Sequence, residues 1–220
     1  MTQAFTRADL RIQLLSAIAA SADVTAFLRF HDVFTSAMTG NLALLGLALG
    51  QGHLALATHS LLALVGFTLG AVAASALGTT AWGRGERILF LELLGLWIFA
   101  AGWCLWGFPV GGGPLALMIL GSAVAMGTQS VLARRINVAG VPSVVFTNTL
   151  TSILIGLTEA LRAGKKPAWV TVQQLTALLA YAGGAVLIAA LLWFSPLLAV
   201  NLPWVALLVV WFLGRHETSA

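Results

Sequence analysis

The sequence predicts an all-α, polytopic transmembrane helix bundle. Hydrophobic residues occupy 60% of the 220 positions and charged residues only 8%, whereas soluble domains carry roughly 25% charged residues. Mean hydropathy is +0.98, and apolar segments follow one another along the chain without a polar run long enough for a separate soluble domain. We therefore expect a single membrane domain over residues 1–220 whose function lies within the bilayer.

The apolar segments are all expected to be helical. A membrane span needs about 20 residues, at about 1.5 Å of rise each, to cross a hydrocarbon core of roughly 30 Å. By this measure the second, sixth and eighth segments are short. In chain order the segments cover residues 12–28, 33–50, 54–78, 88–110, 115–133, 144–161, 170–194 and 197–213.

The order of the segments predicts a duplication, with one repeat over residues 11–110 and the other over 114–214. Residues 16–23 align with 122–129, and residues 38–42 align with 146–150. The spacing of roughly 106 to 108 residues persists to the end of the chain, as expected for an internal repeat.

The basic residues predict the topology. If all eight segments crossed the membrane, the eleven Lys and Arg residues would divide six against five between its faces. If the second and sixth segments instead enter and leave on one face, all but Arg29 lie in the cytoplasm, which satisfies the positive-inside rule. Each half then crosses three times, so the sequence predicts two inverted repeats of three spanning helices plus one re-entrant or broken helix, with both termini cytoplasmic. In a rival topology the first segment does not span and the second does, which breaks the equivalence of the halves.

The second and sixth segments carry the polar residues. Thr35, Ser36, Thr39, Gly40 and Asn41 interrupt the second segment. We expect each segment to run inward as extended chain and to return as a helix that starts near residues 39–41 or 147–149, with Ser, Thr and Asn as N-caps. The two helix N-termini would face each other near the midplane and favour an anionic or dipolar guest. Alternatively, these side chains only bond neighbouring helices.

Asp23 is the strongest single candidate for a functional residue. It lies about 18 Å along the helix from Arg11, past the midplane, where a carboxylate is costly and usually functional. It would act as a proton-coupling acid, a cation ligand or a counter-charge for helix ends; the structural alternative is a protonated or Arg29-paired Asp. Its counterpart, Gln129, keeps the polarity without the charge. The predicted substrate-binding residues are Asp23, Thr39, Gly40, Asn41, Gln129, Thr147, Asn148 and Thr149.

Other motifs predict structural roles. Glu92 and Glu159 are expected to pair with Arg87 or Arg162 near the membrane surface, while His53 and His59 lack a third metal ligand. Gly66 with Gly70, and Gly183 with Gly184, indicate close helix packing within a subunit or across a homodimer. The polar breaks are strengthened by Gly40 in the first half and by Gly140 and Pro142 in the second.

The chain lacks the signatures of an enzyme. It has no HExxH motif, Ser-His-Asp set, clustered acids or nucleotide loop, so we expect no catalytic residue, cofactor or metal. The basic residues are scattered at segment ends, which indicates topology rather than a nucleic-acid interface. The expected partners are the lipid bilayer and an unidentified small solute or ion.

Several of these residues together resemble a known family. They are Asp23-Val24-Thr25-Ala26-Phe27-Leu28, Phe34, Met38-Thr39-Gly40-Asn41, Ala125-Met126-Gly127, Gln129, Arg134-Arg135, Gly140-Val141-Pro142-Ser143 and Thr147. This set is similar to the pattern of the YoaK-like family of small bacterial inner-membrane proteins of unknown function. The resemblance implies a bacterial cytoplasmic-membrane location and no particular activity. One departure is Thr147-Asn148, where a Thr-Gly pair is expected.

Two functions follow from these patterns. The first is a small-solute or ion transporter or channel with a midplane site between the two interrupted helices. The second is a membrane-embedded assembly or interaction protein that carries nothing. The second function predicts a dry, close-packed centre in which Asp23 is paired to a side chain.

Overall fold

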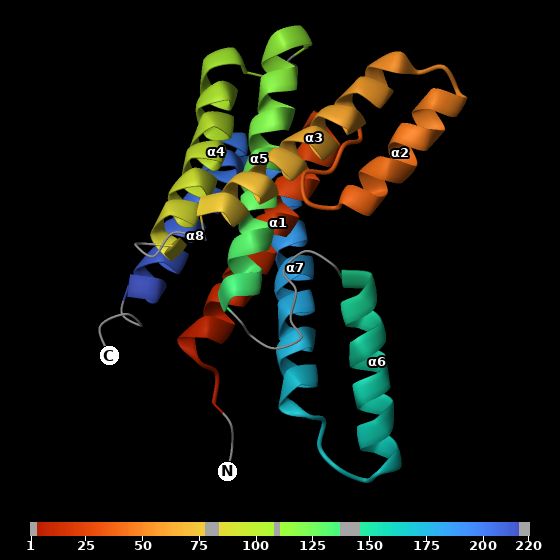
Figure 1. The fold of residues 1–220 in the computed structure, drawn as a ribbon, viewed down its shortest axis with the longest axis vertical. Helices are drawn as coiled ribbons and strands as arrows, with labels where there is room; N and C mark the ends of the chain where they lie inside the picture. The colour runs from red at the N-terminus through yellow and green to blue at the C-terminus, as the bar shows by residue number, and fades with distance from the viewer. Residues whose placement is uncertain (1–3, 78–83, 108–110, 137–145, 216–220) are drawn as a thin grey trace.

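The computed structural model describes residues 4–77, 84–107, 111–136 and 146–215, and these residues form helices and connecting turns without a strand (Figure 1). This confirms the all-α prediction. The helices are α1 (Arg7–Arg29), α2 (Met38–Gly50), α3 (Leu54–Leu77), α4 (Arg84–Trp106), α5 (Gly112–Ile136), α6 (Phe146–Arg162), α7 (Trp169–Phe194) and α8 (Pro196–Arg215).

Six of the described helices are long and apolar enough to cross a membrane, namely α1, α3, α4, α5, α7 and α8. Helix α1 has 23 residues and starts in a reciprocal capping box between Thr6 and Asp9, which satisfies two backbone N–H groups at its exposed end. Helix α2 has only 13 residues and α6 has 17. By length and composition, the rival topology in which the first segment does not span is therefore disfavoured.

Helices α1 and α5 form the centre of the bundle, since 61% of the most apolar stretch of each helix is buried inside the protein. Helix α1 packs on α7 and α8, and α5 packs on α3 and α4 (Figure 1). The remaining contacting pairs are α2 with α3, α6 with α7, α3 with α4, α7 with α8, α1 with α5, and α4 with α8. The contacts are symmetric between the two halves of the chain. When each helix of α1–α4 is replaced by the helix four places later, and each of α5–α8 by the helix four places earlier, every contacting pair becomes another contacting pair or itself.

Glycines allow the closest helix approaches. A Cβ atom added to Gly66 on α3 would lie 2.7 Å from the carbonyl oxygen of Leu120 and 3.0 Å from Cβ of Ala123. In the other half, a Cβ on Gly184 would lie 2.8 Å from the carbonyl oxygen of Ala17. Ala17 and Ala123 are aligned with each other in the predicted repeat. In each half, therefore, a glycine allows close backbone packing against the helix that carries this alanine.

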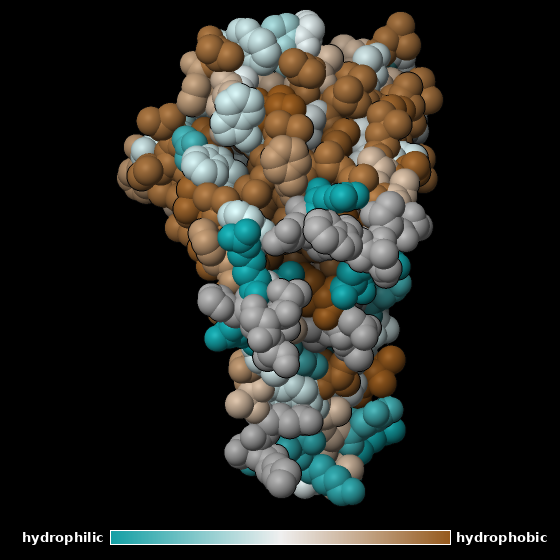
Figure 2. All heavy atoms as spheres, turned by 60° about the vertical axis from the view of Figure 1, so that its left-hand side comes forward, coloured by the Kyte–Doolittle hydropathy of each residue, from teal (hydrophilic) through white to brown (hydrophobic). Residues whose placement is uncertain are grey.

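The outer surface is apolar over much of its height. Figure 2 shows hydrophobic residues covering the upper part of one face, with hydrophilic residues gathered toward the lower end. Phe90, Trp97 and Leu105 of α4 are between 58% and 76% exposed. Exposed apolar side chains of this size are expected where a helix faces lipid.

Candidate functional site

The carboxylate of Asp23 holds the chain between α1 and α2. Its Oδ1 accepts the backbone N–H of Thr35 at 2.8 Å and that of Ser36 at 2.6 Å. Its Oδ2 accepts the hydroxyl of Ser36 at 2.5 Å and that of Tyr181 at 3.0 Å. Asp23 is only 1% exposed. The carboxylate therefore joins α1, the segment before α2, and α7 through donors that satisfy both of its oxygens.

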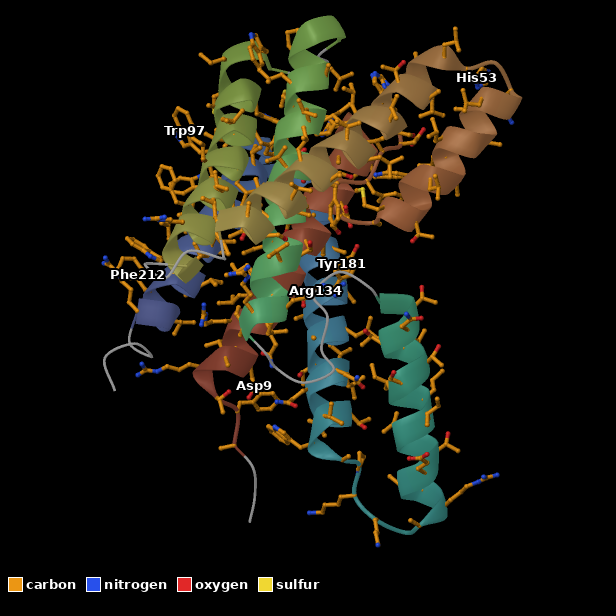
Figure 3. All side chains as sticks on the ribbon, viewed as in Figure 1. Asp9, His53, Trp97, Arg134, Tyr181 and Phe212 are labelled. Carbon is orange, nitrogen blue, oxygen red and sulfur yellow. The ribbon has the colours of Figure 1, made fainter. Side chains whose placement is uncertain are left out.

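Tyr181 was not among the sequence-predicted residues. It is the single tyrosine of the chain and lies partway along α7, level with the lower part of α5 (Figure 3). A buried tyrosine hydroxyl normally finds a polar partner, so a lone tyrosine in an apolar helix was a usable signal. The sequence could not indicate which residue it binds, because Asp23 is 158 positions away.

Asn41 also binds the segment between α1 and α2, through two hydrogen bonds to the backbone of Phe34. Its Oδ1 accepts the N–H of Phe34 at 2.9 Å, and its Nδ2 donates to the carbonyl of Phe34 at 2.6 Å. The Phe34 ring stacks on Phe27 of α1 with centroids 5.0 Å apart, and its edge covers Gly40, where an added Cβ would lie 3.0 Å from the ring. Asn41 is fully buried, and its two hydrogen bonds satisfy both backbone groups of Phe34.

The predicted start of the second helix is confirmed to within a residue, since α2 begins at Met38. The predicted capping is wrong. The N-cap residue is Ala37, and no side chain caps the helix. Thr39 and Asn41 lie inside the first turn. The N–H groups of Thr35 and Ser36, which precede the helix, donate to Asp23 of α1.

Gln129 is buried on α5, and its Nε2 donates to the carbonyl of Leu15 on α1 at 2.8 Å. Its Oε1 is buried and has no hydrogen-bond partner. Gln129 therefore bridges the two central helices, as its counterpart Asp23 bridges α1 and α7. The two residues do not contact each other through any hydrogen bond of the described chain.

The second polar turn is separate from the first. At the start of α6, Thr147 and Asn148 are exposed and Thr149 is buried. Within the described helices, α2 packs on α3, α6 packs on α7, and no contact joins α2 to α6. The structure thus places Asp23 and Asn41 around one segment, Gln129 in the centre, and residues 147–149 on a peripheral helix. Gly140 and Pro142 fall outside the described residues.

Glu92 lies elsewhere than the sequence predicts. It was expected to pair with Arg87 near the membrane surface, but its side chain is 0% exposed and neither carboxylate oxygen has a hydrogen-bond partner. Glu92 points into the bundle, because its helical face also carries Gly95, which meets Ala125 of α5. Sequence distance from Arg87 could not indicate which face of α4 is buried.

Histidines gather at the end of the molecule where α1 finishes. His31, Asp32, His53 and His59 line an open cavity of about 490 Å³, and the rings of His31 and His59 stack with centroids 5.7 Å apart. His31 and Asp32 have positive φ angles of 57° and 62°, which are uncommon for residues other than glycine. Within the described residues no group of three or more His, Cys, Asp or Glu side chains is arranged to hold a metal ion.

The fold and this arrangement define a class: a polytopic α-helical membrane protein with buried polar groups in its core. The chain belongs to the family described as protein of unknown function DUF1275, whose model matches residues 12–213. It is similar to the UPF0700 transmembrane protein YoaK of Bacillus subtilis (strain 168), with 34% identity over 186 residues that cover 81% of each chain. The resemblance seen in the sequence is thereby confirmed. No solved structure matches the chain.

Proposed function

We propose that the chain is a transporter or channel for a small solute or ion in the bacterial cytoplasmic membrane, built from two oppositely oriented halves. The observation that supports this most is the exchange of contacts, by which every contact of α1–α4 has a counterpart in α5–α8. Many secondary transporters consist of inverted repeats that move against each other around a central site.

A re-entrant α2 is supported by the histidine cavity. Asp32, before α2, and His53, after it, line the same cavity, so the chain leaves and returns at one end of the molecule. Between them, residues 33–37 run to the level of Asp23, where Thr35 and Ser36 are bound. Backbone of this kind persists inside a membrane only where protein or a cavity surrounds it. We propose the same arrangement for the second half, and the positive-inside rule then predicts that both termini lie in the cytoplasm.

The solute pathway is proposed to pass between the halves, where α1 meets α5. Asp23 and Gln129 lie on these two helices at equivalent positions of the repeat. The helix starts at residues 39–41 and 147–149 lie outside this region, because α2 packs on α3 and α6 packs on α7, and we propose that they reach a guest only when the halves move. We propose no catalysis, cofactor or resident metal for this site.

A second candidate function is membrane-embedded assembly without transport. It is favoured by the state of Asp23, which is 1% exposed and saturated by Thr35, Ser36 and Tyr181. Gly46 and Gly50 on α2, and separately Gly183 on α7, meet no other heavy atom within 4 Å at an added Cβ, so either helix face would be free to pack against a partner helix or a second copy.

The two functions are separated by flux through purified protein in liposomes. We expect stopped-flow light scattering to show entry of phosphate, acetate or glycerol above the rate of protein-free liposomes, and Gln129→Leu to lower that rate. Gly183→Ala serves as the matched control, because nothing lies near its added methyl group. If folded wild-type protein moves none of these probes and no imposed ion gradient, the transport proposal fails and the assembly function is favoured.

A further inference from the structure

We infer that Glu92 is a proton-binding residue in the core of the bundle, with Gln129 as its partner. Proton binding by Glu92 does not depend on the proposed transport function, but the role of that proton as the coupling ion does. Two buried groups have atoms without a hydrogen-bond partner: both carboxylate oxygens of Glu92 and Oε1 of Gln129. Each side chain is 0% exposed.

Helix register places these groups at one level of the bundle. Helices α4 and α5 are antiparallel, since Gly95 meets Ala125 and Gly102 meets Met118. Glu92 lies three residues before Gly95, and Gln129 lies four residues after Ala125. Residues three and four apart share a helix face, so Glu92 and Gln129 lie at one level, each on the face that meets the other helix.

Among the described side chains, none gives Glu92 a cationic hydrogen-bond partner. The neighbouring core consists of apolar side chains, among them Leu89 and Leu96 of α4 and Leu132 of α5. Three helices pack on α4, namely α3, α5 and α8. Their charged or titratable groups are His59 near the far end of α3, Arg134 and Arg135 at the exposed end of α5, and Arg215 at the exposed end of α8. Neither these groups nor Arg87 of α4 itself forms a hydrogen bond with Glu92.

A proton resolves this arrangement. An ionised carboxylate in an apolar core without a partner is strongly unfavourable, whereas a carboxyl group is neutral and has one O–H to donate. Oε1 of Gln129 is the unsatisfied acceptor at the same level, since its Nε2 is already bound to Leu15. Movement of the two halves would hydrate the carboxyl group and release its proton to water. Binding of another proton would return Glu92 to its neutral form.

The test measures proton binding without any flux. Infrared difference spectra of the full-length protein in liposomes are recorded between acid and alkaline buffer, and the carboxylic acid C=O band is followed with its shift in D2O. We expect Glu92→Gln to lose a pH-dependent band that wild type and Glu159→Gln retain, since Glu159 is exposed on α6. Gln129→Leu is expected to keep the band and shift its frequency.

The proposal is overturned if Glu92→Gln keeps the full band, or if Na+ abolishes the wild-type band at fixed pH while choline does not, which would assign the site to a metal cation. If Glu92→Gln does not fold, Glu92→Asp replaces it and must move the band. A protein that shows the Glu92 band but no flux refutes the transport function alone. A protein with flux and no such band refutes only the present inference.

Discussion

Asp23 and Ser36 are joined by two hydrogen bonds, from the Ser36 backbone N–H at 2.6 Å and from its hydroxyl at 2.5 Å. The pair ties α1 to the segment that precedes α2. Hydrogen bonds to a charged group are worth about 1.5–3 kcal/mol each, and Asp23 is buried. The carboxylate is therefore expected to decide whether residues 33–37 keep their position inside the bundle.

Asp23→Ala is expected to lower the stability of the folded protein by at least about 3 kcal/mol, because it leaves the N–H groups of Thr35 and Ser36 unsatisfied. The measurement is thermal unfolding in detergent, combined with the alkylation rate of a cysteine introduced at Thr39. Asp32→Ala is the matched control, since Asp32 is exposed at the end of α1. Equal melting temperatures for both variants would refute the anchoring role.

The bond between Tyr181 and Asp23 is tested by a double-mutant cycle. Tyr181→Phe removes a hydroxyl that donates to Oδ2 at 3.0 Å, and we expect a loss of about 1–3 kcal/mol. In the Asp23→Asn background the same change is expected to cost less, giving a coupling energy above about 0.5 kcal/mol. Strict additivity of the two changes would show that the hydroxyl contributes nothing through Asp23.

The adjacent glycines of α7 provide a matched pair. Gly184→Ala places a methyl group 2.8 Å from the carbonyl oxygen of Ala17, and overpacking of this kind costs about 1–3 kcal/mol. Gly183→Ala meets no heavy atom within 4 Å and is expected to leave the melting temperature unchanged or raised. The reverse order would mean that α1 and α7 do not approach in this way.

Asn41→Ala is expected to destabilise the protein by about 1–3 kcal/mol, because the N–H and C=O of half-buried Phe34 then lose their hydrogen-bond partner. Thr39→Ala, two residues earlier and exposed, should cost far less. Urea-induced unfolding followed by tryptophan fluorescence gives both values. Similar costs for the two variants would contradict the bridging role of Asn41.

Labelling tests the re-entrant proposal for α2. In a Cys104→Ser background, cysteines replacing Asp32 and His53 are expected to react with an impermeant maleimide from the same side of the membrane, because both residues line one cavity. A cysteine replacing Lys165, after α6, should react from the opposite side. Labelling of Asp32→Cys and His53→Cys from different sides would mean that α2 crosses the bilayer.

The helices and one of the key residues could be read from the sequence, whereas most partners could not. The start of α2 follows from the polar run that begins at Thr35, and Asp23 stands out because a carboxylate in an apolar helix is costly. Glu92 was assigned to the surface on the strength of its sequence distance from Arg87. That distance says nothing about the side of α4 that faces the bundle, and the structure buries it.

The chain alone determined that this is a helical membrane protein, where its helices lie, and that it belongs with a YoaK-like family. Only the tertiary structure decided which face of each helix turns inward and which polar atoms find partners there. The physical reason is that lipid is as apolar as the interior of the bundle. A leucine that faces the bilayer therefore cannot be told from a leucine that faces α5 in the sequence. The hydrogen-bond partners of Tyr181 and Gln129 lie on other helices and are known only from the packing.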